Sequence, residues 1–364
     1  MNKFSLHDIG LCERFVQEAA MYEKSLHLAR ISVQHRDIYQ VITQYGEFPA
    51  EVSGKFIYRA SAAENYPAVG DWVLVDRSEG VSGNAIIHHV LTRKSSFERK
   101  AAGTGYECQV VAANIDTVFI CMSLNNDYNL RRLERYLSIA WESRATPVIV
   151  LTKSDLCSDL GQKLPEIEAV ALGVDVLVTS SLSKDGYDNI KQYLQPGKTV
   201  AFIGSSGVGK STLINKLLGN EVLATQEIRA DDKGRHTTTH RQLLVLPGGG
   251  VVIDTPGMRE LQIAGADLSS SFADIEELAA HCRFNDCRHE SEPQCAVRKA
   301  IAEGTLSSQR LESYKKLQKE LTFAERKSTM SLQQAQKQKI IDMMGSLKTC
   351  RQMQAFNRKN KGNK

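Results

Sequence analysis

One glycine-rich segment near the middle of the chain restricts its fold more than any other feature. Residues 204–211 read GSSGVGKS and match the pattern G-x-x-x-x-G-K-[ST], between the apolar run TVAFI and the helix-like run STLINKLLG. In that context the glycines let the backbone curl so that its N–H groups point inward, and the following helix presents its positive end to phosphate. The segment therefore predicts a phosphate-binding loop at a strand–helix junction.

Individual side chains of this loop have distinct expected roles. Lys210 is expected to reach the β- and γ-phosphate oxygens, and Ser211 is expected to bind Mg²⁺. The predicted nucleotide-binding residues of the segment are Gly204, Ser205, Ser206, Gly207, Val208, Gly209, Lys210, Ser211 and Thr212.

A second motif indicates which base is bound. Thr152, Lys153, Ser154 and Asp155 directly follow the apolar run PVIVL. After a strand, the Asp of TKSD accepts two hydrogen bonds from guanine, and the Lys stem lies over the purine face. Adenine would leave the carboxylate unpaired, so the motif predicts GTP rather than ATP. Ser180, after the next predicted strand, is expected to support the base.

The order of the motifs is unusual. Residues 251–257 read VVIDTPG, where Asp254 is expected to hold the Mg²⁺ shell and the N–H of Gly257 to sense the γ-phosphate. Ordinary GTPases place the base motif after the phosphate loop and DxxG, whereas here it comes first. Because parallel strands lie side by side, a chain cut elsewhere assembles the same site. The order predicts a circularly permuted GTPase domain.

Apolar runs and helical patterns alternate around these motifs, in the rhythm of a doubly wound α/β sheet. Strands are predicted at 116–124, 147–151, 174–178, 199–203 and 251–254, and helices at 130–143, 164–172, 187–194 and 211–219.

Residues 30–97 show a different sequence pattern, in which short apolar runs are separated by glycines. Five or six short strands, among them 38–42, 56–58, 72–75 and 85–90, predict a small β-barrel, for which the oligonucleotide-binding (OB) type is one candidate. Residues 30–100 contain nine basic and eight acidic residues, so any RNA-binding face must be local. The candidates for such a face are Arg93, Lys94, Arg99 and Lys100.

Three of the eight cysteines crowd into one segment. Cys282, Cys287, His289 and Cys295 form a set of four ligands suited to tetrahedral Zn²⁺, with no position left open for catalysis. Eight cysteines are too few for a disulfide scaffold in a chain of 364 residues. We therefore predict one structural zinc per chain, and the alternative is a group of free cytosolic thiols.

The two ends of the chain differ in charge. Apolar spacing predicts an amphipathic helical segment within residues 1–29. Residues 310–364 contain fourteen basic and four acidic residues, a net charge of +10. Such a basic helical tail could contact a polyanion or simply be a solvated helix. No apolar run is long enough for a membrane span, and no secretory signal is visible, so we expect a cytoplasmic protein without membrane contact.

The chain is too long for one ordinary domain. The expected order is an N-terminal helical segment (1–29), an OB-type β-barrel (30–100), a linker (101–115), a circularly permuted GTPase domain (116–264), a small, mostly α zinc-binding module (265–310) and a basic helical tail (311–364).

A β-barrel followed by TKxD, GxSGVGKS, HTTT, DTPG and C-x4-C-x-H-x5-C, in this order, resembles the ribosome small-subunit-dependent GTPase A (RsgA) family of bacterial circularly permuted GTPases. The resemblance covers about residues 30–310. It implies an OB-fold domain, GTP hydrolysis stimulated by the small (30S) ribosomal subunit, and a role in late maturation of that subunit. The implied partners are GTP, GDP, the small subunit and its rRNA, and we expect a monomer.

The residues that would activate the attacking water do not follow the pattern of many small GTPases. Met258 follows the DxxG glycine, where many small GTPases carry a water-orienting Gln, so slow hydrolysis by the free protein is expected. The resemblance favours Thr238 as the Mg²⁺-binding switch threonine, with Thr237 as the alternate. It also implies that His236 positions or deprotonates the attacking water, and His240 is the next candidate.

Two other functions are compatible with these motifs. One is a guanine-nucleotide-gated RNA-binding assembly module whose hydrolysis is incidental, which Met258 makes conceivable. The other is a permuted GTPase of the large ribosomal subunit, whose motifs would not predict the zinc cluster. GTP turnover of the protein alone, with small subunits and with large subunits distinguishes the three.

Overall fold

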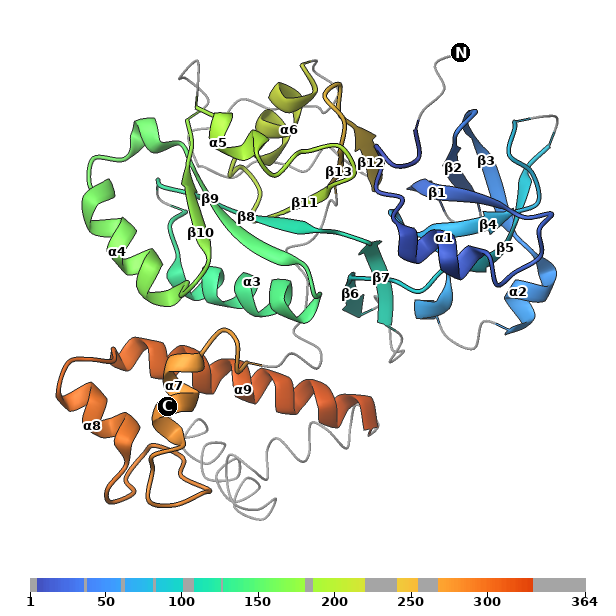
Figure 1. The fold of residues 1–364 in the computed structure, drawn as a ribbon. Coiled ribbons are helices and arrows are strands. Elements are labelled where there is room, and N and C mark those ends of the chain that lie inside the picture. The colour runs from blue at the N-terminus through green and yellow to red at the C-terminus, as the bar shows by residue number, and fades with distance from the viewer. Residues whose placement is uncertain are drawn as a thin grey trace, which may run out of the picture. The chain divides into compact units, whose positions relative to one another are not determined.

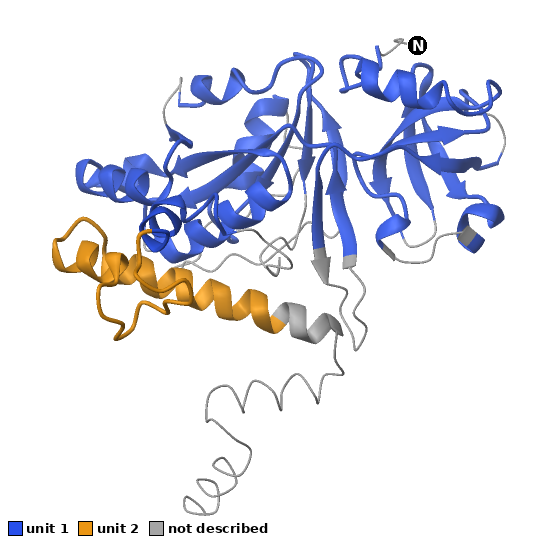
Figure 2. Ribbon diagram, turned by 60° about the horizontal axis from the view of Figure 1, so that its bottom comes forward, with its two compact units in different colours: residues 1–262, 267–280 blue, residues 263–266, 281–364 orange. Residues whose placement is uncertain are grey.

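The computed structural model describes residues 5–35, 38–59, 63–80, 83–100, 108–125, 127–180, 186–219, 241–254 and 268–329 (Figure 1). The chain divides into two compact units (Figure 2). The first comprises Met1–Gln262 and Asp267–Ala280, and the second comprises Ile263–Ala266 and His281–Lys364. The predicted barrel and the predicted GTPase region thus belong to one unit, and the cysteine cluster belongs to the other.

The first unit begins with a closed β-barrel. Its elements are α1 (Glu13–Ala19), β1 (His27–Gln34), β2 (Tyr39–Thr43), β3 (Gly46–Val52), α2 (Gly54–Arg59), the 3-10 turn η1 (Ala63–Asn65), β4 (Trp72–Val75) and β5 (Ala85–Val90). Among the described strands, five pair in the order β1-β2-β3-β5-β4, and β4 pairs back to β1. Alternate apolar side chains point inward and form a dry core. That core includes Ala29, Ile31, Val41, Val73 and Ile87. The predicted small β-barrel is confirmed.

Two local predictions in this region are wrong. Residues 56–58, predicted as a strand, lie in α2, because the Ser53 hydroxyl accepts the N–H of Phe56 at 3.0 Å and begins a helix there. Within the described residues 5–29 of the N-terminal segment, the only α-helix is Glu13–Ala19, and β1 already begins at His27. Pairing of β1 with both β2 and β4 outweighs the helical spacing of the apolar residues before residue 30.

The rest of the first unit is an α/β domain. Its elements are β6 (Ser96–Lys100), β7 (Cys108–Ala113), β8 (Thr117–Ser123), α3 (Leu130–Glu142), β9 (Thr146–Thr152), the 3-10 turn η2 (Ser154–Leu156), α4 (Leu160–Val170), β10 (Asp175–Val178), α5 (Asp188–Lys191), β11 (Thr199–Ile203), α6 (Lys210–Leu218), β12 (Gln242–Val245), β13 (Val251–Asp254) and α7 (Ala273–Ala279). Of the described strands, β10-β9-β8-β11-β13 are parallel in that order, and β12 pairs antiparallel with β13. The chain proceeds outward from β8 to β9 and β10 in one direction, and from β11 to β13 in the other, so the switch point of this doubly wound sheet lies between β8 and β11.

The barrel and the α/β sheet are joined by hydrogen bonds. Strand β1 pairs with β12 at Val33 and Gln242, so eleven of the described strands form a single sheet. The predicted linker 101–115 contains β7, which pairs antiparallel with β6. Strand β7 buries Val110, Val111, Ala112 and Ala113, and this apolar burial fixes the segment as a strand despite the nearby glycines.

Arg30 of β1 is fully buried where the barrel meets the α/β sheet. Its Nε donates to the carbonyl of Gly70 (3.2 Å), and Nη1 donates to the carbonyl of Ile9. Its Nη2 donates to the carbonyl of Asn114 (3.3 Å) and to Thr199 Oγ1 (2.9 Å). One side chain therefore connects the N-terminal segment, the barrel, the turn before β8 and the start of β11.

Burial disfavours the charged form of this guanidinium. It lowers the pKa of Arg30 to about 10, and the charges of Asp116 and Asp71 offset part of the effect. The guanidinium carbon also lies 5.5 Å from the ring centroid of Trp72, within the range of a cation–π contact. Arg30 is thus a buried cation whose hydrogen bonds hold several segments together.

The second unit contains α8 (Ala296–Ala302) and α9 (Ser308–Thr329). The predicted helix near residue 311 is therefore present, and residues 330–364 of the predicted tail lie outside the described residues. In the part of the chain that the structure describes, no helix has both the length and the apolar composition needed to cross a membrane.

Substitution Arg30→Met is expected to destabilise the protein by about 3–5 kcal/mol, because methionine leaves buried acceptors without their donor. Arg77→Met is the matched control: Arg77 pairs with Asp76 at 3.0 Å where each side chain is 30% exposed. Loss of such a partly exposed pair costs about 1 kcal/mol. Urea unfolding of both variants measures the difference. An Arg30→Met protein with the wild-type midpoint would contradict this role.

Candidate functional site

The parallel strands bring the predicted motifs to one edge of the sheet. Strands β8, β9, β10, β11 and β13 run in the same direction, so their carboxyl ends lie together. In such sheets ligands bind outside these ends, at the switch point. TKSD begins at the last residue of β9, Ser180 follows β10, the phosphate loop follows β11 and Asp254 ends β13.

The phosphate loop adopts a conformation that its glycines permit. Gly204, Gly207 and Gly209 have φ values of +147°, +76° and +100°. A Cβ atom on Gly204 would lie 2.4 Å from the carbonyl oxygen of Cys121 in the neighbouring strand β8. Helix α6 begins at Lys210, so the N–H groups of its first turn, with Ser211 and Thr212, lie beside the loop. This arrangement suits an anion such as phosphate.

Lys210 folds back onto the loop. Its Nζ donates to the carbonyl oxygens of Gly204 (2.8 Å) and Ser205 (2.6 Å). These bonds fix the ammonium against the loop, where its positive charge can pair with phosphate oxygens.

The base motif is tied both to the phosphate loop and to the segment after β10. Thr152 Oγ1 donates to the carbonyl of Val208 in the loop at 2.6 Å. Ser180 Oγ donates to Asp155 Oδ1 at 2.5 Å, which fixes one carboxylate oxygen. Lys153 adopts a left-handed conformation with φ of +57°, so the chain turns sharply between strand β9 and Asp155. The structure thus brings together the base motif, Ser180 and the phosphate loop.

Asp254 has the features of a magnesium ligand. Its side chain is buried, and its Oδ2 has no hydrogen-bond partner in the described part of the chain. Burial raises the pKa of this carboxyl, and the charge of Lys210 offsets part of the rise. A buried carboxylate oxygen without a donor is stabilised by a hard divalent cation, so the residues fit Mg²⁺.

Other predicted residues cannot be placed. His236, Thr237, Thr238, His240, Gly257 and Met258 lie outside the described residues.

Sequence reasoning overlooked Asp127, in the loop after β8. Its carboxylate accepts a hydrogen bond from the Ser205 hydroxyl of the phosphate loop. The available signal was the polar run Asn125-Asn126-Asp127 directly after the apolar strand, because that position is the carboxyl end of a parallel strand.

Two candidates for an RNA-binding face form ion pairs within the protein. Arg93 Nη2 lies 2.7 Å from Asp71 Oδ2, and Lys94 Nζ lies 2.7 Å from Asp116 Oδ1. Asp71 is fully buried, so its charge requires Arg93 as a partner. These pairs give both basic residues a structural role within the first unit.

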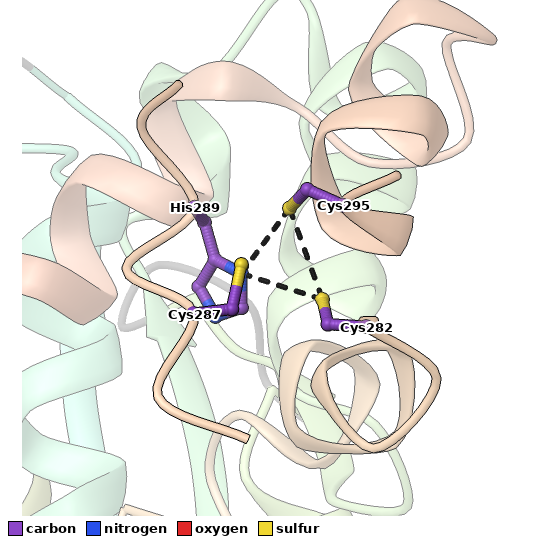
Figure 3. A group of neighbouring side chains, drawn as sticks. All are labelled: Cys282, Cys287, His289 and Cys295. Carbon is purple, nitrogen blue, oxygen red and sulfur yellow. Dashed lines mark hydrogen bonds between the residues drawn. The ribbon is translucent and has the colours of Figure 1, made fainter. Parts of the chain in front are cut away.

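The second unit contains the predicted metal cluster. Cys282, Cys287, His289 and Cys295 point toward one another, and their ligand atoms all lie within 4.8 Å of one another (Figure 3). Cys295 Sγ is 3.8 Å from Cys282 Sγ and 3.3 Å from His289 Nδ1. Three thiols and one imidazole at this spacing could hold a metal ion.

Neighbouring groups shape the loop that carries His289. Backbone N–H groups, first that of Arg288 and then others including Glu290, donate to the Glu292 carboxylate and lower its pKa to about 2. Lys315 of α9 donates to the carbonyl of His289 at 3.3 Å. Such outer contacts orient the ligands of a metal site.

The fold and the site define a class: a phosphate-loop GTPase whose base motif precedes its phosphate loop. The RsgA GTPase family model matches residues 90–264. An ABC transporter model matches residues 187–349, a region that contains the phosphate loop, a motif of both classes, but not TKSD.

Relatives that match most of the chain identify the family. The chain is 52% identical over 338 residues to "Small ribosomal subunit biogenesis GTPase RsgA 2" of Lactiplantibacillus plantarum, covering 93% of this chain and 95% of that protein. It is 46% identical to "Small ribosomal subunit biogenesis GTPase RsgA 1" of Listeria innocua, covering 88% of this chain and 91% of that protein.

Solved structures agree with this assignment. YjeQ from Thermotoga maritima has a TM-score of 0.61 and 28% identity, covering 82% of this chain and 99% of that one. YloQ, "a circularly permuted GTPase", has a TM-score of 0.58 and 25% identity, covering 82% and 95%. The chain therefore belongs to the RsgA GTPase family, and it is a GTP hydrolase with the predicted permuted order.

Asp155→Asn is expected to weaken GTP binding by about 1.5–3 kcal/mol, because the amide places a donor where guanine presents donors. Asp159→Asn is the control, since Asp159 lies outside TKSD and pairs with Lys163 at 2.9 Å. Titration with a fluorescent GTP analogue measures both affinities. Unchanged GTP affinity in Asp155→Asn, or tight ATP binding by the wild type, would refute the assignment of TKSD.

Proposed function

We propose that this protein hydrolyses GTP to GDP and phosphate when bound to the small ribosomal subunit, and that it acts late in the maturation of that subunit. The observation that carries the proposal is the assembly of TKSD, the phosphate loop and Asp254 at one sheet edge, in a chain that also has a Cys3His cluster. The names of the relatives, small ribosomal subunit biogenesis GTPases, support this partner. We further propose rRNA contact, a cytoplasmic location and a monomeric state.

Each segment of the proposed nucleotide site binds a different part of the ligand. Asp155 pairs with the guanine edge, and Lys153 covers the purine face. The loop N–H groups and Lys210 bind the phosphates. Ser211, Thr238 and Asp254 would hold Mg²⁺, which would neutralise charge on the phosphates.

The proposed water-activating group is His236. Met258 cannot orient water, so the free protein lacks the Gln-type contribution of many small GTPases. A loop histidine that is correctly placed only with nucleotide, Mg²⁺ and the subunit present would make hydrolysis depend on the partner.

The proposed metal of the Cys3His cluster is one structural Zn²⁺. Three thiolates and one imidazole fill a tetrahedral shell and leave no open position for a substrate. The contact of Lys315 with the His289 carbonyl links the cluster to α9, so the metal would stabilise the second unit as a whole.

Purified protein is expected to contain one zinc per chain, and Cys287→Ala is expected to lose the metal and lower the melting temperature, because binding energy at a structural site is folding energy. Cys12→Ala is the control, since Cys12 is an exposed thiol far along the chain from the cluster. Elemental analysis and thermal unfolding test this. Absence of zinc from protein prepared without chelator, or wild-type melting of Cys287→Ala, would refute the site.

Turnover is expected to be slow for the free protein and strongly raised by small subunits. His236→Ala should reduce the stimulated rate by roughly 10²–10⁴-fold, the usual contribution of a general base or positioning group, without loss of GTP or subunit binding. Thr238→Ala should instead weaken the GTP-bound state itself. Phosphate release assays with small and with large subunits measure these rates.

Two results would contradict this scheme separately. Normal stimulated turnover in His236→Ala would move water activation to another group, with His240 the next candidate. Stimulation by large subunits and not by small ones would refute the proposed partner.

A further inference from the structure

The loop after β8 touches the phosphate loop through one acidic side chain. Asp127 Oδ2 accepts a hydrogen bond from Ser205 Oγ. Its other oxygen, Oδ1, lies 2.6 Å from Nη1 of Arg132 in the first turn of α3. The start of α3 is itself fixed, because Asn129 accepts the backbone N–H of Arg132 at 3.0 Å. Asp127 therefore connects an anchored helix to the phosphate loop.

Ser205 makes a second contact that matters for the nucleotide. While its hydroxyl is bonded to Asp127, its backbone carbonyl accepts a hydrogen bond from Lys210 Nζ at 2.6 Å. Ser205 is thus held in place through its side chain. Its backbone carbonyl in turn holds the Lys210 ammonium, which is proposed to face the phosphates. A displacement of Ser205 would move one of the acceptors that set the position of Lys210.

We propose that Asp127 is a positioning residue for nucleotide binding, which acts through Ser205 to fix the phosphate loop and Lys210. Arg132 supports it by offsetting the charge of the carboxylate. This inference rests on the nucleotide site proposed above. Asp127 is not assigned any contact with the nucleotide.

The ion pair with Arg132 is needed because Asp127 is negatively charged and lies next to the proposed phosphate site. A carboxylate next to a polyphosphate site repels the ligand unless a cation offsets it. Asp127 and Arg132 each have 33% of their side chain exposed, so solvent screens the pair only in part. Two variants separate the two effects: Ser205→Ala removes the hydrogen bond at constant charge, and Arg132→Gln removes the offsetting charge but retains the Ser205 hydroxyl.

The experiment measures the equilibrium and the dissociation rate of a fluorescent GDP analogue with Mg²⁺ on the full-length protein. Ser205→Ala is expected to raise Kd about tenfold, mainly through faster dissociation, because a hydrogen bond to a charged group is lost. Asp127→Asn in the Ser205→Ala background should cause no further rise, since its partner is absent. Ser205→Thr, which retains the hydroxyl, should restore affinity.

Salt dependence provides a readout that a merely structural role would not change. Arg132→Gln is expected to raise Kd several-fold at low ionic strength, with the difference from wild type shrinking as salt screens Asp127. Asp188→Asn is the control, because Asp188 forms an exposed pair with Lys191 at 2.6 Å. Thermal unfolding without nucleotide shows that each variant is folded.

The outcomes are distinct. Wild-type protein that fails to bind the GDP analogue would overturn the nucleotide site and this inference together. If wild type binds but folded Ser205→Ala has wild-type affinity, or if the effects of Ser205→Ala and Asp127→Asn simply add, the positioning role alone is overturned. Non-additive losses, with rescue by Ser205→Thr, would establish it.

Discussion

The buried guanidinium of Arg30 determines how the parts of the first unit fit together, because its N–H groups donate hydrogen bonds to acceptors in four different segments of the chain. One of these acceptors is Thr199, the first residue of β11, and β11 leads directly into the phosphate loop. A buried cation must keep its acceptors, since an unpaired charge in the interior costs several kcal/mol. The barrel is therefore joined to the α/β domain rather than attached independently. A ligand that binds the barrel would bind the same compact unit that contains β11, the strand before the phosphate loop.

The nucleotide site depends on neighbours in space rather than on chain order. The contact of Thr152 with Val208 joins the base motif to the phosphate loop, and Gly204 is required because the carbonyl of Cys121 in β8 lies too close for any Cβ. The Gly204 contact joins the adjacent strands β11 and β8, and the Thr152 contact joins the ends of β9 and β11 on either side of β8. Both depend on positions in the sheet, so they survive a change in where the chain begins. Permutation alters which segment follows β13 and leaves the site itself intact.

The sequence correctly predicted the elements that depend on motifs and ligand spacings visible along the chain. The phosphate loop and the Cys3His set follow from glycine and ligand spacing within a few residues, and the permuted order follows from the positions of TKSD, the phosphate loop and DTPG along the chain. What sequence missed depends on distant partners: β7 is a strand because it pairs with β6 and is buried, and Arg93 is held by Asp71 from another part of the chain. The contact of Asp127 with Ser205 likewise appears only when β8 and β11 are neighbours. Spacing alone carries no information about such pairings.

The carboxylates of Asp127 and Asp254 have different environments, and this difference separates their proposed roles. Asp127 has both oxygens engaged, one by Arg132 and one by Ser205, so the protein itself stabilises its charge. Asp254 is buried, its pKa is raised, and its Oδ2 lacks a partner among the described residues. Burial without a donor disfavours the ionised form until a cation is present. Asp127 is thus held by contacts within the protein, whereas the proposed Mg²⁺ would supply the charge stabilisation that Asp254 Oδ2 lacks among the described residues, and would in this way couple metal and nucleotide binding in one site.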